Sequence, residues 1–253
     1  MTDQIAAHWP AVLGVIAAFL AGGIVKGVIS LGLPLVALPL LLFVVDVKVG
    51  IALLLVPMVV SNVLQAVEGE GTLALLRRFA PLLVALTIGA LIGTSLLARL
   101  DTRTLQLTIG PVAIVFAVAS FLHPHLAVSA RSEWWMGPVI GFFSGVIGGM
   151  TTFFGPVLAA YIFGLHLGRD AFVKGIAIIY VFAASLLMFG GIAHGYATPT
   201  LLMLSCLGMI PVYLGMRIGT RIRHRMDPEK FRLLVLGAVC VTGVNMIRLG
   251  LGY

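Results

Sequence analysis

The side chains that could bind a polar ligand stand inside long apolar stretches of this 253-residue sequence. The first such stretch, residues 11–45, contains a single charge, Lys26. Lys26 lies about 15 residues into the stretch, about 22 Å along a helix. A lysine at that depth in a bilayer costs at least about 2.5 kcal/mol unless something stabilises it. Two interpretations stay open: a cation that binds an anion, or a lysine that extends to the interface or bonds carbonyls where the helix breaks.

Hydroxyl side chains form a second set of candidate ligand-binding groups. Ser30 follows Lys26 by one helical turn, and Ser144, Thr151 and Thr152 stand in the later stretch FFSGVIGGMTTFFGP. These hydroxyls could donate hydrogen bonds to an oxyanion. In membrane helices they also bond the backbone carbonyl four residues earlier, so both roles stay open.

Four further polar residues have roles that the sequence leaves open. Asn62 and Gln65, one turn apart on a third apolar segment, could line a cavity or join helices. Lys174 stands early in a later segment, where we expect an interfacial anchor, with a gate or anion funnel as the alternative. Glu68 is expected to be solvated in a loop. It is also the acidic residue to test first for proton coupling, because the apolar segments contain no Asp or Glu.

The composition excludes most other classes of protein. With 60% hydrophobic and 10% charged residues, the chain cannot cover a soluble globule, and its long apolar segments indicate helices rather than a barrel. The net charge of +7 is concentrated in the loop 217–232, which the positive-inside rule places in the cytoplasm, so no nucleic acid partner is expected. Neither protease motifs nor metal-ligand spacings occur. The sequence predicts no enzyme activity, no metal and no cofactor.

The halves of the chain repeat one another. The stretch 11–45 would be about 52 Å long as one helix, so we expect a break between Gly22 and Pro34. Ile92-Gly93-Thr94 recurs as Ile218-Gly219-Thr220, 126 positions later, and Gly27-Val28-Ile29 recurs as Gly145-Val146-Ile147, 118 positions later. We therefore predict an all-α, polytopic transmembrane helical bundle made of two repeats with broken first helices, residues 1–122 and 134–253, joined by a linker at 123–133.

The number of crossings follows from how the broken stretches are counted. One crossing for each gives eight crossings and parallel repeats, whereas two segments for each give ten segments and inverted repeats. The second count puts Arg77, Arg78 and Arg131 on the same side as the loop 217–232, and the first puts Arg99 and Arg103 there. Both counts put the two termini outside.

Two short motifs resemble the twin glycine-rich signatures of the TauE/SafE sulfite exporter family. They are Gly23-x-x-Lys26-Gly27-x-x-Ser30-x-Gly32 and Gly141-x-x-Ser144-Gly145-x-x-Gly148-Gly149. The resemblance implies a permease for small sulfur-containing anions such as sulfite, sulfonates or sulfoacetate. Lys26 replaces a serine of the general pattern, and Met150-Thr151-Thr152 stand where a further glycine is expected. These departures predict a subgroup with its own selectivity.

Together the residues and the resemblance predict a secondary transporter of the inner membrane that works by alternating access. Its partners would be a small anion, the lipid bilayer and a coupling ion, either a proton or sodium, with a homodimer left open. A permease for a carboxylate or another inorganic anion, and a non-transporting accessory protein, are the alternatives. The predicted substrate-binding residues are Lys26, Gly27, Ser30, Gly32, Asn62, Ser144, Gly145, Gly148, Gly149, Thr151 and Thr152, with Glu68 and Lys174 for coupling or gating.

Overall fold

The computed structural model describes residues 2–29, 33–67, 71–122, 130–154, 158, 161–162, 164–223, 237, 240, 243–244 and 246–252. Within these ranges the chain is helical and has no strand. The helices are α1 (Thr2–Ile29), α2 (Leu33–Leu41), α3 (Val47–Val67), α4 (Thr72–Arg99), α5 (Thr102–Leu122), α6 (Ala130–Thr151), α8 (Arg169–Ala193) and α9 (Pro199–Arg223). Five segments of α1, α3, α4, α8 and α9 are long and apolar enough to cross a membrane. The predicted all-α, polytopic membrane fold is confirmed.

The first apolar stretch folds into a hairpin of two antiparallel helices. Gly14, early in α1, lies against Val44, and Gly22 lies against Ala37 of α2. The α1 helix continues without interruption through Gly22 to Ile29, and α2 begins at Leu33. The break therefore falls at the end of the predicted range. The glycines within α1 do not interrupt the helix.

These glycines instead let α1 approach α9 closely. A Cβ atom at Gly27 would overlap the carbonyl oxygen of Met216, and about two turns of α9 further back the ring of Phe19 fills the space beside Gly208. Since the residue numbers at these contacts increase in the same direction along both helices, α1 and α9 run parallel. Small residues permit such close backbone contact in membranes, where packing rather than water drives association.

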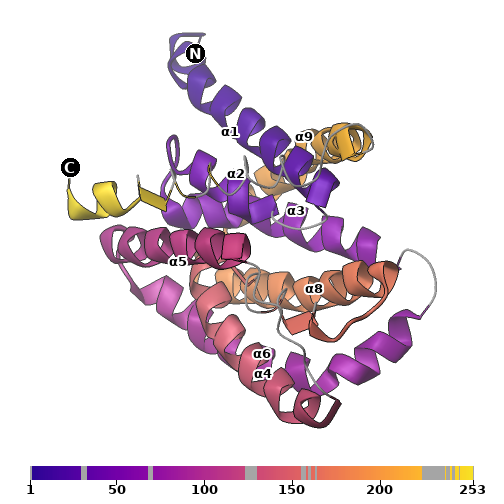
Figure 1. Ribbon diagram of the computed structural model, residues 1–253. Helices are drawn as coiled ribbons and strands as arrows, with labels where there is room; N and C mark the ends of the chain where they lie inside the picture. Colours follow the sequence, from indigo (N-terminus) through magenta and orange to yellow (C-terminus); the bar gives the residue numbers. More distant parts are fainter. Residues whose placement is uncertain are drawn as a thin grey trace.

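The second half repeats this contact with the partners exchanged. Gly141 of α6 lies against Leu82 of α4, and a Cβ at Gly149 would lie 2.8 Å from the carbonyl oxygen of Ala90. α4 and α6 therefore run parallel, as α1 and α9 do. The first helix of each half therefore packs against a helix of the other half: α1 against α9, and α6 against α4. Figure 1 shows the result, with α3 and α8 between the α1–α9 pair and the α4–α6 pair.

The equivalent contacts set the register of the repeat. Gly27 corresponds to Gly149, 122 positions later, and Ala90 corresponds to Met216, 126 positions later. The spacing of 126 agrees with the sequence match around Ile92. The spacing of 118 predicted for the first helices is wrong by four residues. Because four residues make about one helical turn, the motif Gly-Val-Ile matched one turn away from its structural equivalent.

Helix directions decide between the two counts of segments. Lys48 at the start of α3 donates to the carbonyl of Ala98 at the end of α4, so these helices are antiparallel. α4 and α8 run parallel, because Phe79 lies against Gly175 and Thr94 against Gly190 further along both helices. α9 runs parallel to α3, because Ser205 bonds Leu53, whereas further along both helices Met216 and Asn62 lie against the adjacent α1 residues Gly27 and Lys26. Hence α1, α3 and α9 run one way, and α4, α6 and α8 run the other. The two halves are inverted repeats, the alternative with two segments for each broken stretch.

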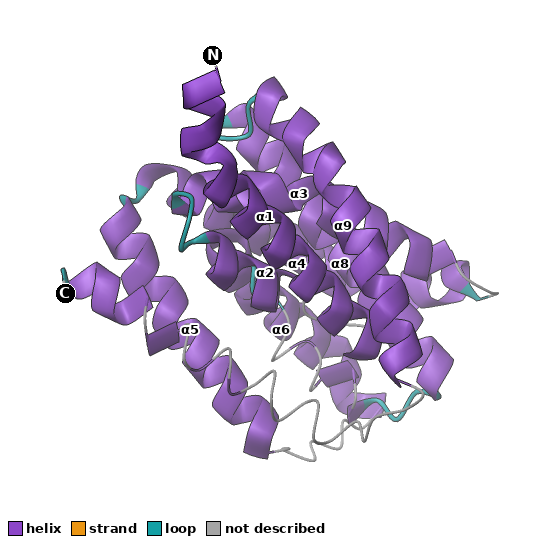
Figure 2. Cartoon of the chain, turned by 90° about the horizontal axis from the view of Figure 1, so that it is seen from above, coloured by secondary structure: helices purple, strands orange, loops and turns teal. Residues whose placement is uncertain are grey.

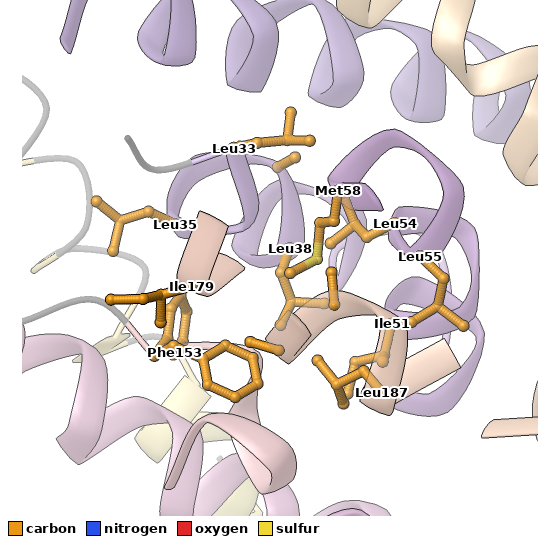
Figure 3. Close-up of a cluster of buried hydrophobic side chains, with 14 of the residues drawn as sticks. Leu33, Leu35, Leu38, Ile51, Leu54, Leu55, Met58, Phe153, Ile179 and Leu187 are labelled. Atoms are coloured by element: carbon orange, nitrogen blue, oxygen red, sulfur yellow. The ribbon is translucent and has the colours of Figure 1, made fainter. Parts of the chain in front are cut away.

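The centre of the molecule is a continuous apolar core. Leu38 of α2, Leu54 of α3 and Leu187 of α8 are fully buried there, together with Phe153 after α6 (Figure 3). The helix α5 lies to one side, beside the C-terminal residues (Figure 2), where Arg103 donates to the carbonyl of Gly250. The predicted linker overlaps α6, which begins at Ala130. The predicted repeat boundaries themselves stay a prediction.

Candidate functional site

Lys26 is buried and bonded to a side chain on α3. It is 3% exposed, and its Nζ donates to Oδ1 of Asn62 at 2.7 Å. The Asn62 amide donates in turn from Nδ2 to the carbonyl of Met58, one turn earlier, at 2.7 Å. This second bond orients the amide so that its oxygen faces Lys26. The lysine therefore points into the protein, as a ligand-binding cation requires, and not toward the headgroups.

The partner of Lys26 is neutral, which leaves the charge at this point of the molecule uncompensated. Among the buried side chains of the described ranges, the charged ones are Lys26 and Lys174, and no carboxylate is buried with them. The ion pair found in these ranges, Arg78 with Glu133, lies elsewhere, between α4 and α6. A buried ammonium is costly unless it is paired and hydrogen-bonded. The Lys26–Asn62 pair therefore favours a small anion as an additional ligand.

The hydroxyls of α6 divide into two kinds. Thr151 donates to the carbonyl of Ile147 at 2.7 Å and accepts from the amide of Phe153 at 3.1 Å, so it serves the backbone at the end of the helix. Ser144 and Thr152 are also buried, but their hydroxyls have no hydrogen-bond partner within the described part of the chain. Thr152 also has φ of 67°, which is unfavourable for a β-branched residue. Of the predicted hydroxyls, Ser144 and Thr152 remain available to a ligand.

Gly148 provides space for an aromatic ring. A Cβ at this position would overlap the ring of Phe154, which folds back over α6. The ring of Phe154 meets Tyr180 of α8 edge to face, with centroids 6.3 Å apart. By contrast, Gly145 and Gly149 face α4, in the close contact described above. The glycines of the second motif thus lie where packing alone requires glycine.

The two motifs approach the centre from opposite ends of the molecule. Lys26 lies near the end of α1, whereas Thr151 and Thr152 lie at the end of α6, which runs the other way. No hydrogen bond within the described ranges joins the Lys26–Asn62 pair to Ser144 or Thr152. The structure therefore brings Lys26 together with Asn62, and within the described ranges it joins neither of them to the hydroxyls of α6 by a hydrogen bond.

The remaining predicted residues have different outcomes. Ser30, Gly32 and Glu68 lie outside the described residues. Lys174 is 6% exposed and adjoins Gly175, which packs against α4. Whether Lys174 serves as an interfacial anchor or as a gate stays a prediction.

Two contacts of α3 are absent from the sequence-based prediction. Asn62 was predicted to bind the substrate but not to contact Lys26, because nothing local in the sequence shows that it faces a residue 36 positions earlier. Ser205 of α9 was not singled out. Its hydroxyl donates to the carbonyl of Leu53 at 2.7 Å and accepts from the amide of Val56 at 3.1 Å. Pro57 has no N–H to bond the Leu53 carbonyl, so a proline inside an apolar helix was the available signal.

Comparison with known proteins adds one match. The family model described as "Sulfite exporter TauE/SafE" matches residues 15–246, a range that includes Lys26, Asn62 and the hydroxyls of α6. Comparisons with curated proteins and with solved structures give no match. The family match indicates a membrane permease, and the inverted-repeat fold is compatible with one.

Proposed function

The chain belongs to the sulfite exporter TauE/SafE family, and we propose that it moves a small sulfur-containing oxyanion, such as sulfite or a sulfonate, across the inner membrane by secondary transport. Family membership makes it an anion permease of the exporter type. The particular anion and the residues that bind it are the subject of the proposal. We assign the binding group to Lys26 and Asn62.

The observation that carries this assignment is the buried Lys26 ammonium with a neutral partner. Sulfite and sulfonates present several oxygens and a negative charge, and they can accept the ammonium hydrogens that Asn62 leaves unused. An anion at this position would supply the missing countercharge. It would gain more there than at an exposed lysine, because little water remains to screen the interaction.

Inverted repeats support alternating access as the mechanism. In transporters with this architecture, the two repeats exchange conformations around a site at their interface. Here each first helix packs on the opposite repeat, so α1 with α9 and α6 with α4 form two units that can rock about α3 and α8 (Figure 1). The start of α4 shares one end of the molecule with the end of α9. The predicted basic loop 217–232 begins inside α9, which continues to Arg223, and we place this end of the molecule, with that basic segment, in the cytoplasm.

The test is anion binding and flux with purified protein. Binding of sulfite, methanesulfonate, sulfoacetate and acetate is measured by calorimetry in detergent, and flux is measured in proteoliposomes. We expect Lys26→Gln to lose binding and flux of the preferred anion by at least about 100-fold, because the countercharge for the anion is gone. The matched control is Lys48→Gln. Lys48 is a half-buried lysine on α3 that bonds the carbonyl of Ala98, and its loss should leave binding unchanged.

The same panel separates the alternatives. Wild-type affinity of the Lys26→Gln variant for every anion would exclude Lys26 as the binding group. A preference for acetate over all sulfur anions would indicate a carboxylate permease. Absence of flux for every anion, in protein that is correctly inserted, would support an accessory role.

A further inference from the structure

We propose that Lys26 is also the proton carrier of the transporter, binding one proton when the anion binds and releasing it when the anion leaves. This inference rests on the proposed function, because it requires the anion at Lys26. It assigns the coupling ion to the proton and its binding site to the same nitrogen atom that meets the substrate. No separate acidic residue is then needed inside the membrane.

The hydrogen-bond geometry around Lys26 suits both forms of the amine. A neutral amine still has a hydrogen to donate to Oδ1 of Asn62, so the 2.7 Å bond persists without the charge. The Nδ2 group of Asn62 donates to the carbonyl of Met58, and its Oδ1 atom is the one that faces the amine. Conversely, the ammonium has more hydrogens than Asn62 can accept. The empty site therefore tolerates the neutral amine, and the occupied site uses the ammonium.

No neighbouring carboxylate in the described ranges stabilises the ammonium when the anion is absent. The helix α2 has no titratable residue. On α9, Cys206, Tyr213, Arg217 and Arg221 are exposed, and the Arg217 guanidinium lies over the Tyr213 ring. On α3, Lys48 lies at the opposite end of the helix from Asn62.

The helix α8 packs on α3 and carries the buried Lys174. Its other titratable residues are Arg169 and Asp170 at its start and Tyr180, whose ring meets Phe154. On α1 itself, Asp3 and His8 are more than four helical turns before Lys26. Among the described residues, no buried carboxylate accompanies Lys26, and an arriving anion would offset the ammonium.

The proton balance of the step is simple. The neutral amine of Lys26, one proton from solution and one monoanion give an ammonium–anion pair with no net charge. After the site opens to the other side, the anion and the proton leave together, and the amine is neutral again. Transport of a monoanion is therefore electroneutral. Glu68, the residue expected from the sequence to carry the proton, is not needed for this cycle.

The experiment measures proton uptake on binding of methanesulfonate. This sulfonate is fully ionised near neutral pH, so any proton taken up belongs to the protein. Calorimetric titrations at pH 8.5 in two buffers with different ionisation enthalpies give the number of protons bound with each anion. An ordinary lysine is already protonated at this pH and would give zero. For the wild-type protein we expect about one proton for each anion.

Three variants assign the proton to a residue. Lys26→Arg keeps the positive charge permanently, so it should bind methanesulfonate with no proton uptake. Glu68→Gln and Lys48→Gln should both retain the uptake of about one proton. Uptake that persists in Lys26→Arg, or that disappears in Glu68→Gln, would overturn the assignment.

A second measurement does not depend on the arginine variant. Because a proton binds with the anion, wild-type affinity for methanesulfonate should fall about tenfold for each unit of pH above 8.5. An affinity that is independent of pH, or binding without proton uptake at pH 8.5, would refute the proton carrier and leave the anion site intact. Failure of the wild-type protein to bind sulfonates at all would instead count against the proposed function.

Discussion

The two halves of the molecule have the same arrangement of helices and differ in the side chains at equivalent positions. In the register of 122, Lys26 of the first half corresponds to Gly148 of the second. Lys26 meets Asn62, whereas the space at Gly148 is occupied by the ring of Phe154. The position that corresponds to Asn62 is Ala184, which is buried and apolar. A duplicated scaffold thus holds a positive charge in one half and an aromatic side chain in the other.

The middle helices differ in the same way. In α3, Pro57 interrupts the backbone hydrogen bonds, and Ser205 of α9 supplies the missing donor to Leu53. The corresponding pair in the second half is Gly175 of α8 with Phe79 of α4, an apolar contact. Of the two middle helices, α3 therefore carries the proline, and the charge of Lys26 stands in the same half.

The largest change in stability is expected when Phe154, whose aromatic ring fills the equivalent space in the second half, is removed. Phe154→Ala removes a side chain that is 1% exposed and should lower the free energy of unfolding by about 3 kcal/mol or more. Thermal unfolding in detergent measures the change. Phe189→Ala is the control, because Phe189 is 65% exposed on α8. In the Phe154→Ala background, Gly148→Ala should cost less than it does alone; equal costs would contradict the packing of this ring on Gly148.

Equivalent glycines test the repeat register itself. Gly27→Ala and Gly149→Ala each force a Cβ against a carbonyl oxygen of a neighbouring helix, so both should destabilise the protein by about 2 kcal/mol. Gly168→Ala, in open space at φ −55°, is the control and should change little. Large effects at Gly27 but none at Gly149 would break the equivalence of the two interfaces. The readout is the midpoint of thermal unfolding.

The proline-interrupted helix should be moderately sensitive to its partner serine. Ser205→Ala leaves the Leu53 carbonyl and the Val56 amide without their shared partner, at a cost of about 1 kcal/mol. Ser95→Ala is the matched control, because the half-buried Ser95 hydroxyl bonds a carbonyl of its own helix. Hydrogen exchange at Val56 should also increase in the variant. Unchanged exchange would show that α3 does not depend on this contact.

The smallest effect is expected at the ion pair between α4 and α6. Arg78 donates to both oxygens of Glu133, at 2.6 and 2.8 Å, and the two side chains are 40% and 20% exposed. Arg78→Gln should cost no more than about 1 kcal/mol, and less at high salt. Leu204 stands at the corresponding position of α9, so the α1–α9 pair has no such bond there. A loss well above this range would mean that the α4–α6 pair depends on charge.

Some predictions succeeded because they rested on a property that any fold of this chain must respect. Lys26 was identified because an isolated charge in an apolar stretch is costly wherever the chain places it. The repeat at 126 was visible because Gly93 and Gly219 both need close contact with another helix. The predicted register of 118 was wrong because glycines recur at neighbouring turns of these helices. A three-residue match can therefore fall one turn away from the structural equivalent. Only contacts with a second helix distinguish these turns.

The chain by itself determined that the protein is helical and lies in a membrane, that it is duplicated, and that a cation stands within its first apolar stretch, because these follow from composition and segment length. Tertiary structure alone decided that the repeats are inverted, that Asn62 is the partner of Lys26, and that Phe154 fills the equivalent space in the other half. Each of these depends on which helices meet, and residues distant in sequence meet only through packing. The physical reason is that a membrane fixes how long a helix must be, but not which neighbour its small and polar side chains will face.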